Sequence, residues 1–203
     1  MVSRRRQVDR TRRIRKRNRF LWIAAEGNNK TERLYFNHLN REQSEYVIKF
    51  APGNDTDPIH MIESVCSCLE DGETEDVGFV VFDTDTGESR QNVINKTKAK
   101  SRNTQVKLIL SNPCIEIWYL LHFRYSTGAV KSSRRAKEEL AEYIPGYHES
   151  LDIYPIIRDK LPEALKNADK LRHYHDQVGN RREIDQNPMT DLDQVIKLLF
   201  KMK

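Results

Sequence analysis

The sequence predicts an α/β protein with a four-stranded parallel sheet that is covered by helices on both faces. Two observations predict this class. Short apolar runs alternate with segments of helical periodicity, in the order β-α-β-α-β-α-β up to residue 110. Within these runs the apolar residues are continuous, which is typical of strands buried on both faces of a sheet. We therefore expect residues 20–125 to form an α/β core.

Each expected element has its own local signal. The strands are the apolar runs, and Pro-, Gly- and Asn-rich turns separate them from segments with apolar residues at helical spacing. The expected strands are residues 20–25, 46–51, the apolar part of 78–87, and 106–110. The expected helices of the core are a segment that opens at residues 28–32, followed by residues 58–70 and 91–100.

A longer apolar segment follows the fourth strand, from Ser111 to Phe123. Ser111 or Asn112 is a good N-cap residue and Pro113 suits the first helical position, so we expect a helix to start there. It is apolar nearly all round and should be buried. Glu116 lies in its first turn, and a buried carboxylate requires a metal ion, a basic side chain or the helix N-terminus as its partner.

Residues 126–203 carry weaker signals, and we expect them to form a helical extension packed on the core. The expected helices are residues 131–144, residues 155–178 with an interruption at Pro162, and a terminal helix after the Asn187–Thr190 stretch. Within the second of these, His173 and His175 could help to bind metal or substrate. They are two residues apart and do not share a helix face, however, so we expect both to be solvated. His122 and Trp118, in the apolar helix, are expected in the core.

The stretch GFVVFDTDTG, residues 78–87, carries the strongest chemical signal. Asp83 and Asp85 leave a buried strand on the same face, because residues i and i+2 of a strand point the same way. Glu26 follows the first strand, and the carboxyl ends of parallel strands meet at one edge of the sheet. Two anions held close together favour a divalent cation between them. A turn that caps the following helix is the alternative for the Asp pair.

Glu26 and Glu32 could each serve a purely local role instead of binding a metal ion. Glu26 is also placed to neutralise Lys30 or Arg33. Glu32 has capping-box spacing with Asn29. The sequence therefore favours a metal ligand and a helix cap equally for this residue.

The basic residues are concentrated in an N-terminal arm, residues 1–19. The arm holds nine Arg, one Lys and one Asp, a net charge of +9, whereas the whole chain carries only +5. Such an arm suits a polyanion, most plausibly nucleic acid. A solvated tail, or one that docks on an acidic partner, is the alternative. The residues expected to contact nucleic acid are Arg12, Arg13, Arg15, Lys16, Arg17 and Lys30.

The composition indicates the cellular compartment in which the protein is expected. Charged residues make up 32% of the chain and hydrophobic residues 37%, and no apolar run is long enough to span a membrane or to form a signal-peptide core. Three cysteines without a CxxC pair argue against a disulfide framework. We expect a cytoplasmic protein with reduced thiols.

Three motifs together resemble those of a known family. They are an EGxxTExxYF-like motif from Glu26 to Phe36, in which Leu34 precedes Tyr35-Phe36, the DxD motif Asp83-Thr84-Asp85, and SNPCxExWxLLHF from Ser111 to Phe123. The chain thus resembles the RloB-like proteins, within the superfamily of Toprim domains that includes the OLD-type nucleases. The long third motif is specific, whereas the two short ones alone would be weak.

The resemblance implies a Rossmann-like Toprim fold and a Mg²⁺- or Mn²⁺-dependent nuclease with two metal ions. Glu26, Asp83, Asp85 and Glu116 would be the catalytic residues, and Glu32 would join them as a metal ligand. The family context implies the effector subunit of a bacterial anti-phage defence system, with an ABC- or AAA-type ATPase as its partner. Its target would be DNA or tRNA. The protein could also form a homo-oligomer.

Two alternative functions fit parts of the sequence. The first is a non-catalytic module that binds nucleic acid or docks on an ATPase. The second is a phosphatase of the haloacid dehalogenase class, but its Asp-x-Asp-Gly-Thr motif belongs on a first strand. Here Thr86 and Gly87 stand in reversed order and follow the third strand.

Overall fold

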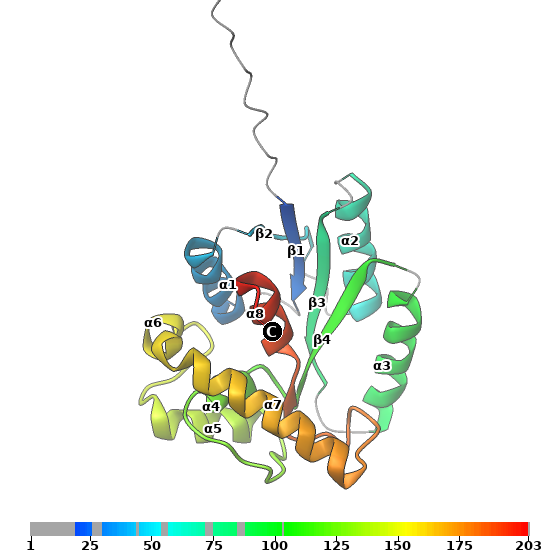
Figure 1. Ribbon diagram of the computed structural model, residues 1–203. Helices are drawn as coiled ribbons and strands as arrows, with labels where there is room; N and C mark the ends of the chain where they lie inside the picture. Colours follow the sequence, from blue (N-terminus) through cyan, green and yellow to red (C-terminus); the bar gives the residue numbers. More distant parts are fainter. Residues whose placement is uncertain are drawn as a thin grey trace, which may run out of the picture.

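The protein is a mostly parallel five-stranded sheet between two layers of helices (Figure 1). The computed structural model describes residues 19–25, 30–43, 45–53, 57–71, 75–84, 88–102 and 104–202, without the side chains of Lys30, Glu88 and Ser89. The strand order is β2-β1-β3-β4-β5. The first four strands are parallel and β5 is antiparallel to β4. The strands are β1 (Arg19–Ala25), β2 (Tyr46–Phe50), β3 (Val77–Asp83), β4 (Val106–Asn112) and β5 (Met189–Thr190).

The prediction of a four-stranded sheet was wrong, because the sheet has a fifth strand, β5, at its edge. Thr190 pairs with Ser111, and their side-chain hydroxyl oxygens are 2.9 Å apart. The backbone N–H of Asp191 also donates to the carbonyl oxygen of Leu110, at 2.8 Å. A strand of two residues is too short to show alternation, so its existence depends on the exposed edge of β4, which offers it hydrogen bonds.

The helices follow the predicted periodicity closely in the core. They are α1 (Lys30–Glu42), α2 (Pro58–Glu70), α3 (Glu88–Ser101), α4 (Glu116–Leu121), α5 (Ser133–Tyr143), α6 (Tyr154–Ile157), α7 (Leu161–Val178) and α8 (Leu192–Phe200), with a 3₁₀ turn at Arg158–Lys160. The predicted interruption near Pro162 is confirmed, because the 3₁₀ turn separates α6 from α7 and Pro162 lies in the first turn of α7. Within the described residues, no helix has the length and apolar character needed to cross a membrane.

The two faces of the sheet bury separate apolar clusters. On one face, Val80 and Phe82 of β3 pack with Ile62 and Val65 of α2. On the other, Val81 joins a larger cluster that includes buried residues of α1, α4, α7 and α8. Alternate residues of β3 thus serve opposite faces, as expected for a strand covered on both sides. The larger cluster draws on the chain both before and after residue 126.

The strand order creates a switch point beside β1. The chain passes from β1 to β2 on one side and then crosses to β3 on the other, so the carboxyl ends of β1 and β3 are neighbours. The register pairs Ala25 with Val81. In open α/β sheets, ligands bind outside the carboxyl ends of the strands at such a point. In Figure 1 this edge lies at the lower end of the sheet, near α4 and α5.

Gly78 allows α2 to pack closely on the sheet. A Cβ atom at this position would lie 2.4 Å from Val65 Cγ1 and 3.0 Å from Leu69 Cδ1. Both contacts are shorter than van der Waals packing tolerates, so a larger residue would push α2 away from β3.

We predict that Gly78→Ala lowers the free energy of unfolding by about 1–3 kcal/mol, the usual cost of overpacking. Gly128→Ala is the matched control, because its Cβ would meet only Ser126 Oγ, at 3.5 Å. Urea unfolding should leave the control within about 0.5 kcal/mol of the wild type. Equal stability of the two variants would show that the close approach of α2 is not required.

Candidate functional site

A small pocket at the carboxyl edge of the sheet brings together carboxylates from distant parts of the chain. Its volume is about 30 Å³, enough for one or two water-sized groups. Glu32 of α1, Asp83 of β3 and Glu116 of α4 all line it. The complete lining is Thr31, Glu32, Asp83, Ile115, Glu116, Lys137, Tyr147 and Glu149.

Strand β3 delivers Asp83 to the pocket. Residues 78–82 are buried between β1 and β4, and Asp83 is the last residue of the strand, half-buried and paired with Ser111 of β4. Immediately after it, the N–H of Thr84 donates to the carbonyl oxygen of Ser111, at 2.8 Å. The position of Asp83 is therefore fixed by the sheet itself.

The first turn of α1 delivers Glu32. This side chain is only 3% exposed, which is unusual for a carboxylate. The preceding residue, Thr31, donates from both its N–H and its hydroxyl group to the carbonyl oxygen of Glu149. The segment after α5 thus holds the start of α1 at the pocket wall.

Helix α4 delivers Glu116, and its start corrects the sequence prediction. The helix begins at Glu116 itself, because Ser111 and Asn112 still belong to β4. The prediction of Ser111 or Asn112 as N-cap, with Pro113 at the first helical position, was wrong. The sheet edge uses these polar side chains instead, and Asn112 donates to the carbonyl oxygen of Glu183, at 2.8 Å.

Two parts of the prediction for this helix are confirmed. All six residues of α4 are buried, and Glu116, 3% exposed, lies in the first turn. Its Oε1 atom accepts a hydrogen bond of 3.0 Å from the hydroxyl group of Tyr147. A tyrosine was not among the partners that the sequence suggested for this carboxylate.

A buried hydrogen bond joins the two helices that carry Glu32 and Glu116. The indole N–H of Trp118 donates to the hydroxyl oxygen of Tyr35, at 2.8 Å, and both residues are fully buried. The ring of Tyr119 packs at 5.8 Å from that of Tyr35. Because these aromatic residues lie within one turn of the two glutamates, they set how α1 and α4 face each other.

Sequence reasoning missed three titratable residues of the pocket, namely Lys137, Tyr147 and Glu149. Lys137 lies on α5 and forms an ion pair with Glu149. These residues occupy a charged amphipathic stretch and its following loop, where nothing in the sequence distinguishes them from solvated neighbours. They are found only because α5 packs against α4 and so borders the pocket.

The electrostatics of the site agree with a cluster of carboxylates. Burial raises the pKa of the Cys114 thiol, and the charges of Glu116 and Asp83 raise it further. Burial also raises the pKa of Tyr147, with additional contributions from Glu116. The pKa of Tyr119 is raised well above its usual range by burial and then by Glu32. Several neutral groups around the pocket are thus held in their protonated form beside negative charge.

The remaining predicted site residues fall outside the described part of the chain. Glu26, Asp85 and the arm residues Arg12, Arg13, Arg15, Lys16 and Arg17 lie outside it, as does the side chain of Lys30. Asn29, the proposed capping partner of Glu32, lies outside it as well. Within the described residues, no three His, Cys, Asp or Glu side chains form a group that could hold a metal ion.

The histidine predictions had different outcomes. His122 and Trp118 lie in the core, as predicted, at 2% and 0% exposure. His173 is exposed, but the prediction for His175 was wrong, because this side chain is 2% exposed. Its two ring nitrogens lie 2.8 Å from the carbonyl oxygen of Pro188 and 2.9 Å from the side-chain nitrogen of Asn180. The segment that leads to β5 covers this face of α7, which the local pattern could not reveal.

The fold and the pocket define a class of protein: a mostly parallel α/β sheet that presents carboxylates from three elements at its carboxyl edge. The chain belongs to the RloB-like family, since the family model described as RloB-like protein matches residues 21–199. This match spans the sheet, the pocket and the C-terminal helices, and it confirms the family suggested by the three motifs. Neither the curated proteins nor the solved structures gave a significant match.

His122 is a buried histidine at the end of α4. Its Nδ1 atom lies 3.0 Å from the carbonyl oxygen of Trp118, and its Nε2 atom is buried without a hydrogen-bond partner among the described residues. Burial lowers its pKa to about 4; hydrogen bonds to the backbone oppose this shift and the charge of Lys160 adds to it. The neutral ring, with its proton on Nδ1, is the form that fits this environment.

We predict that His122 contributes stability above pH ~6.5, its pKa in the unfolded chain, and that this contribution is lost as the pH falls toward about 4. Below pH ~6.5 the unfolded chain binds a proton that the folded protein excludes. The free energy of unfolding therefore falls by up to about 3 kcal/mol. Chemical denaturation across this range should show a smaller acid loss for His122→Gln than for the wild type. The exposed His148→Gln is the control and should follow the wild type. A His122→Gln profile parallel to that of the wild type would contradict the prediction.

Proposed function

We propose that this RloB-like protein is a metal-dependent nuclease that hydrolyses phosphodiester bonds in DNA or RNA. The observation that carries this proposal is the convergence of Glu32, Asp83 and Glu116 on one small pocket at the carboxyl edge of the sheet. Three carboxylates from separate elements are costly to bring together, and a cation between them is the usual compensation.

The donor chemistry suits a hard divalent cation such as Mg²⁺ or Mn²⁺. Carboxylate oxygens are the ligands that these ions prefer, and Mg²⁺ keeps several waters in place of a full protein cage. The described carboxylates do not form a metal-holding group by themselves. The proposal therefore also requires Glu26 and Asp85, which follow in the chain directly after Ala25 of β1 and directly after Thr84.

The proposed fold class is the Toprim fold. Its support is the parallel order β2-β1-β3-β4 with carboxylates at the carboxyl edge of the strands, together with the family membership. In this assignment the Asp83-Thr84-Asp85 motif and Glu26 belong to the catalytic centre, and Glu116 and Glu32 complete it.

The roles of the chain's own groups follow from their positions. Bound Mg²⁺, as one ion or two, would supply an activated water and would offset the charge that develops on the leaving oxygen. Asp83 of β3 and Glu32 of α1, which both line the pocket, would hold the ion. Tyr147 restrains Glu116 by donating a hydrogen bond to its Oε1 atom. Lys137 places a positive charge at the rim, where a substrate phosphate would enter.

The biological setting is part of the same proposal. The family context favours the effector subunit of an anti-phage defence system that works with an ABC- or AAA-type ATPase. The sequence contains no P-loop motif, so in this proposal ATP hydrolysis belongs to the partner. The second candidate is a module that binds nucleic acid or docks on the ATPase without catalysis. The lack of a complete metal-holding group among the described residues favours it.

We predict that Asp83→Asn lowers Mg²⁺-dependent cleavage of nucleic acid by roughly 10²–10³-fold, the usual loss when one preorganised charge is removed from an active site. Asp159→Asn is the matched control, because its side chain is 91% exposed and does not line the pocket. Cleavage of labelled DNA and of tRNA should be measured with Mg²⁺ or Mn²⁺, with and without the ATPase. Equal cleavage by both variants would exclude the nuclease and leave the binding module.

We further predict that Tyr147→Phe weakens Mn²⁺ binding by about 10-fold, because the carboxylate of Glu116 loses the hydroxyl group that orients it. Isothermal titration calorimetry with Mn²⁺ alone measures this without reference to cleavage. Tyr143→Phe makes the same chemical change outside the pocket, where the ring stacks on Phe123. Tyr143→Phe should bind Mn²⁺ like the wild type, and an equal loss in both variants would contradict the proposed role of Tyr147.

A further inference from the structure

The start of α5 carries an unusual concentration of positive charge beside the carboxylate pocket. Residues 131–137 contain four cations and no anion, and we call Lys131, Arg134, Arg135 and Lys137 the α5 basic cluster. The following residues, 138–142, contain three glutamates. The helix thus has a basic amino end and an acidic carboxyl end.

This charge order opposes the dipole of the helix. Acidic side chains are favoured in the first turn and basic ones in the last, yet α5 has no acidic residue in its first turn and no basic residue in its last. Its ion pairs also place the arginine before the glutamate, the less favourable orientation along a helix. The stability of the helix therefore does not explain the arrangement.

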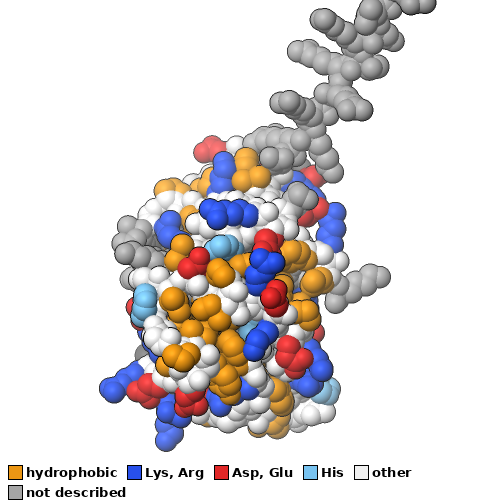
Figure 2. Space-filling model, turned by 90° about the vertical axis from the view of Figure 1, so that its left-hand side faces the viewer, with side chains coloured by type: hydrophobic (Ala, Val, Ile, Leu, Met, Phe, Trp, Pro, Cys, Tyr) orange, Lys and Arg blue, Asp and Glu red, His pale blue; other side chains and the backbone are white. Residues whose placement is uncertain are grey.

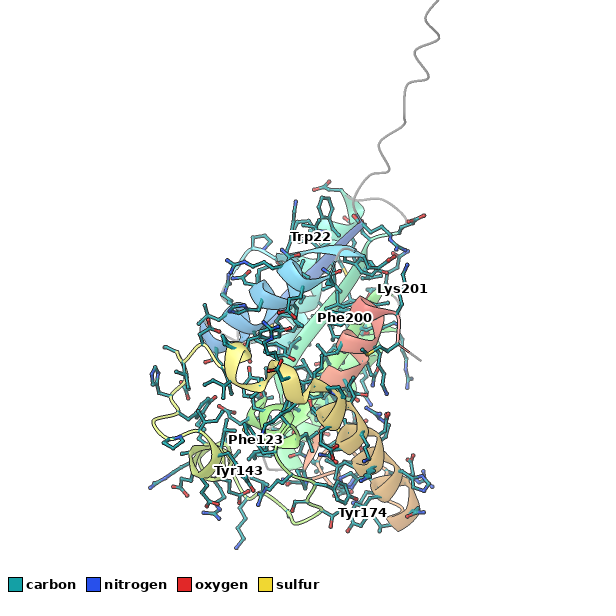
Figure 3. The ribbon with its side chains drawn as sticks, turned by 60° about the vertical axis from the view of Figure 1, so that its left-hand side comes forward. Trp22, Phe123, Tyr143, Tyr174, Phe200 and Lys201 are labelled. Carbon is teal, nitrogen blue, oxygen red and sulfur yellow. The ribbon has the colours of Figure 1, made fainter. Side chains whose placement is uncertain are left out.

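The arginines of the cluster are available to a ligand. The side chains of Arg134 and Arg135 are 89% and 51% exposed. Their partners, Glu138 and Glu139, are one turn away, at 3.0 Å and 2.9 Å. The pair of Arg134 with Glu138 is exposed on both sides and contributes little to stability, so a phosphate group can replace this glutamate at small cost. The side chain of Glu139 is only 12% exposed, but it keeps Arg124 as a second partner when Arg135 turns to a ligand. Figure 3 shows α5, identified by Tyr143, at the outer margin of the molecule.

The cluster borders the pocket through one of its members. Lys137 lines the pocket, and Ser133 forms a side-chain hydrogen bond with Cys114, two residues before Glu116. Only about 6 Å of helix separates positions 133 and 137, and the two arginines lie between them. In Figure 2, Lys and Arg side chains are mixed with Asp and Glu along the lower part of the face, while apolar side chains occupy its middle.

The pocket itself repels a phosphate. Among the described residues, its lining includes four carboxylates, Glu32, Asp83, Glu116 and Glu149, and one cation, Lys137. The N-terminal arm joins the structure at Arg19, at the amino end of β1, about 20 Å from the carboxyl edge by the rise of a strand. This is roughly twice the Debye length at moderate salt, so charge at that junction is screened from the pocket.

We propose that the α5 basic cluster binds the phosphate backbone of the nucleic acid whose scissile bond enters the carboxylate pocket. The cluster supplies the attraction that the pocket lacks, and it fixes the strand beside the reacting position. The inference rests on the proposed nuclease function for the identity of the ligand. Backbone phosphates are common to DNA and RNA, so the cluster accepts either and carries no base specificity.

The test is binding of a fluorescein-labelled DNA duplex and of a labelled tRNA by the full chain, in EDTA so that no cleavage occurs. Arg134→Gln together with Arg135→Gln should weaken binding by about 10-fold or more and should reduce the slope of log K against log salt by about 1–2 for the duplex. Lys96→Gln together with Lys100→Gln removes the same charge from α3 and should stay within about 2-fold of the wild type. Melting temperatures within about 2 °C of the wild type confirm that both pairs are folded.

Each outcome decides between the two proposals. Equal weakening by both pairs, unchanged binding by the α5 pair, or no salt-dependent binding of either probe by the wild type would overturn the inference. Cleavage is measured separately in Mg²⁺. If the α5 pair binds normally while Asp83→Asn abolishes cleavage, the inference fails and the nuclease stands. If the α5 pair loses binding and the wild type cleaves nothing, binding of nucleic acid by the cluster stands, whereas the nuclease and the placement of a scissile bond in the pocket fail.

Discussion

The hydrogen bond from Trp118 to the hydroxyl group of Tyr35 fixes the geometry on which the candidate site depends. Tyr35 lies one turn after Glu32 on α1, and Trp118 lies two residues after Glu116 on α4, so this one contact sets the separation of two buried carboxylates. Both partners are fully buried, and loss of either would leave a polar group unpaired, at a cost of about 1–3 kcal/mol. The aromatic core between α1 and α4 is thus part of the site as well as of the fold.

The parallel sheet adds the third carboxylate by a different constraint. Parallel pairing brings the carboxyl ends of β1, β3 and β4 to one edge, so the pairing of β3 with β4 brings Asp83 to the same edge as the start of α4. The order β2-β1-β3 places the switch point beside β3. The site therefore depends on two separate constraints, a sheet topology and a helix-helix contact, which is why its residues are scattered over more than 80 positions from Glu32 to Glu116.

The sequence predicted those parts of the structure that local pattern determines. The buried run before Asp83 and the all-apolar helix around Glu116 are evident from hydrophobic periodicity, and their common edge follows from parallel pairing. The start of α4 was mispredicted because Asn112 has capping chemistry in the sequence but completes its hydrogen bonds with the loop at Glu183. The strand β5, the burial of His175 and the wall formed by Tyr147 all depend on contacts between segments far apart in the chain, and no local signal encodes them.

Burial of Glu32 and Glu116 together has an energetic consequence for the rest of the molecule. Two carboxylates, each 3% exposed and sharing a pocket with Asp83, disfavour one another's charge in a medium of low dielectric constant. The chain compensates with Lys137 and with the hydroxyl group of Tyr147, both supplied by α5 and the loop after it. This segment also holds α1 through Glu149. Since the same segment restrains the glutamates and carries the basic cluster, the proposed binding of a cation in the pocket and the proposed binding of phosphate by the cluster would be coupled through α5.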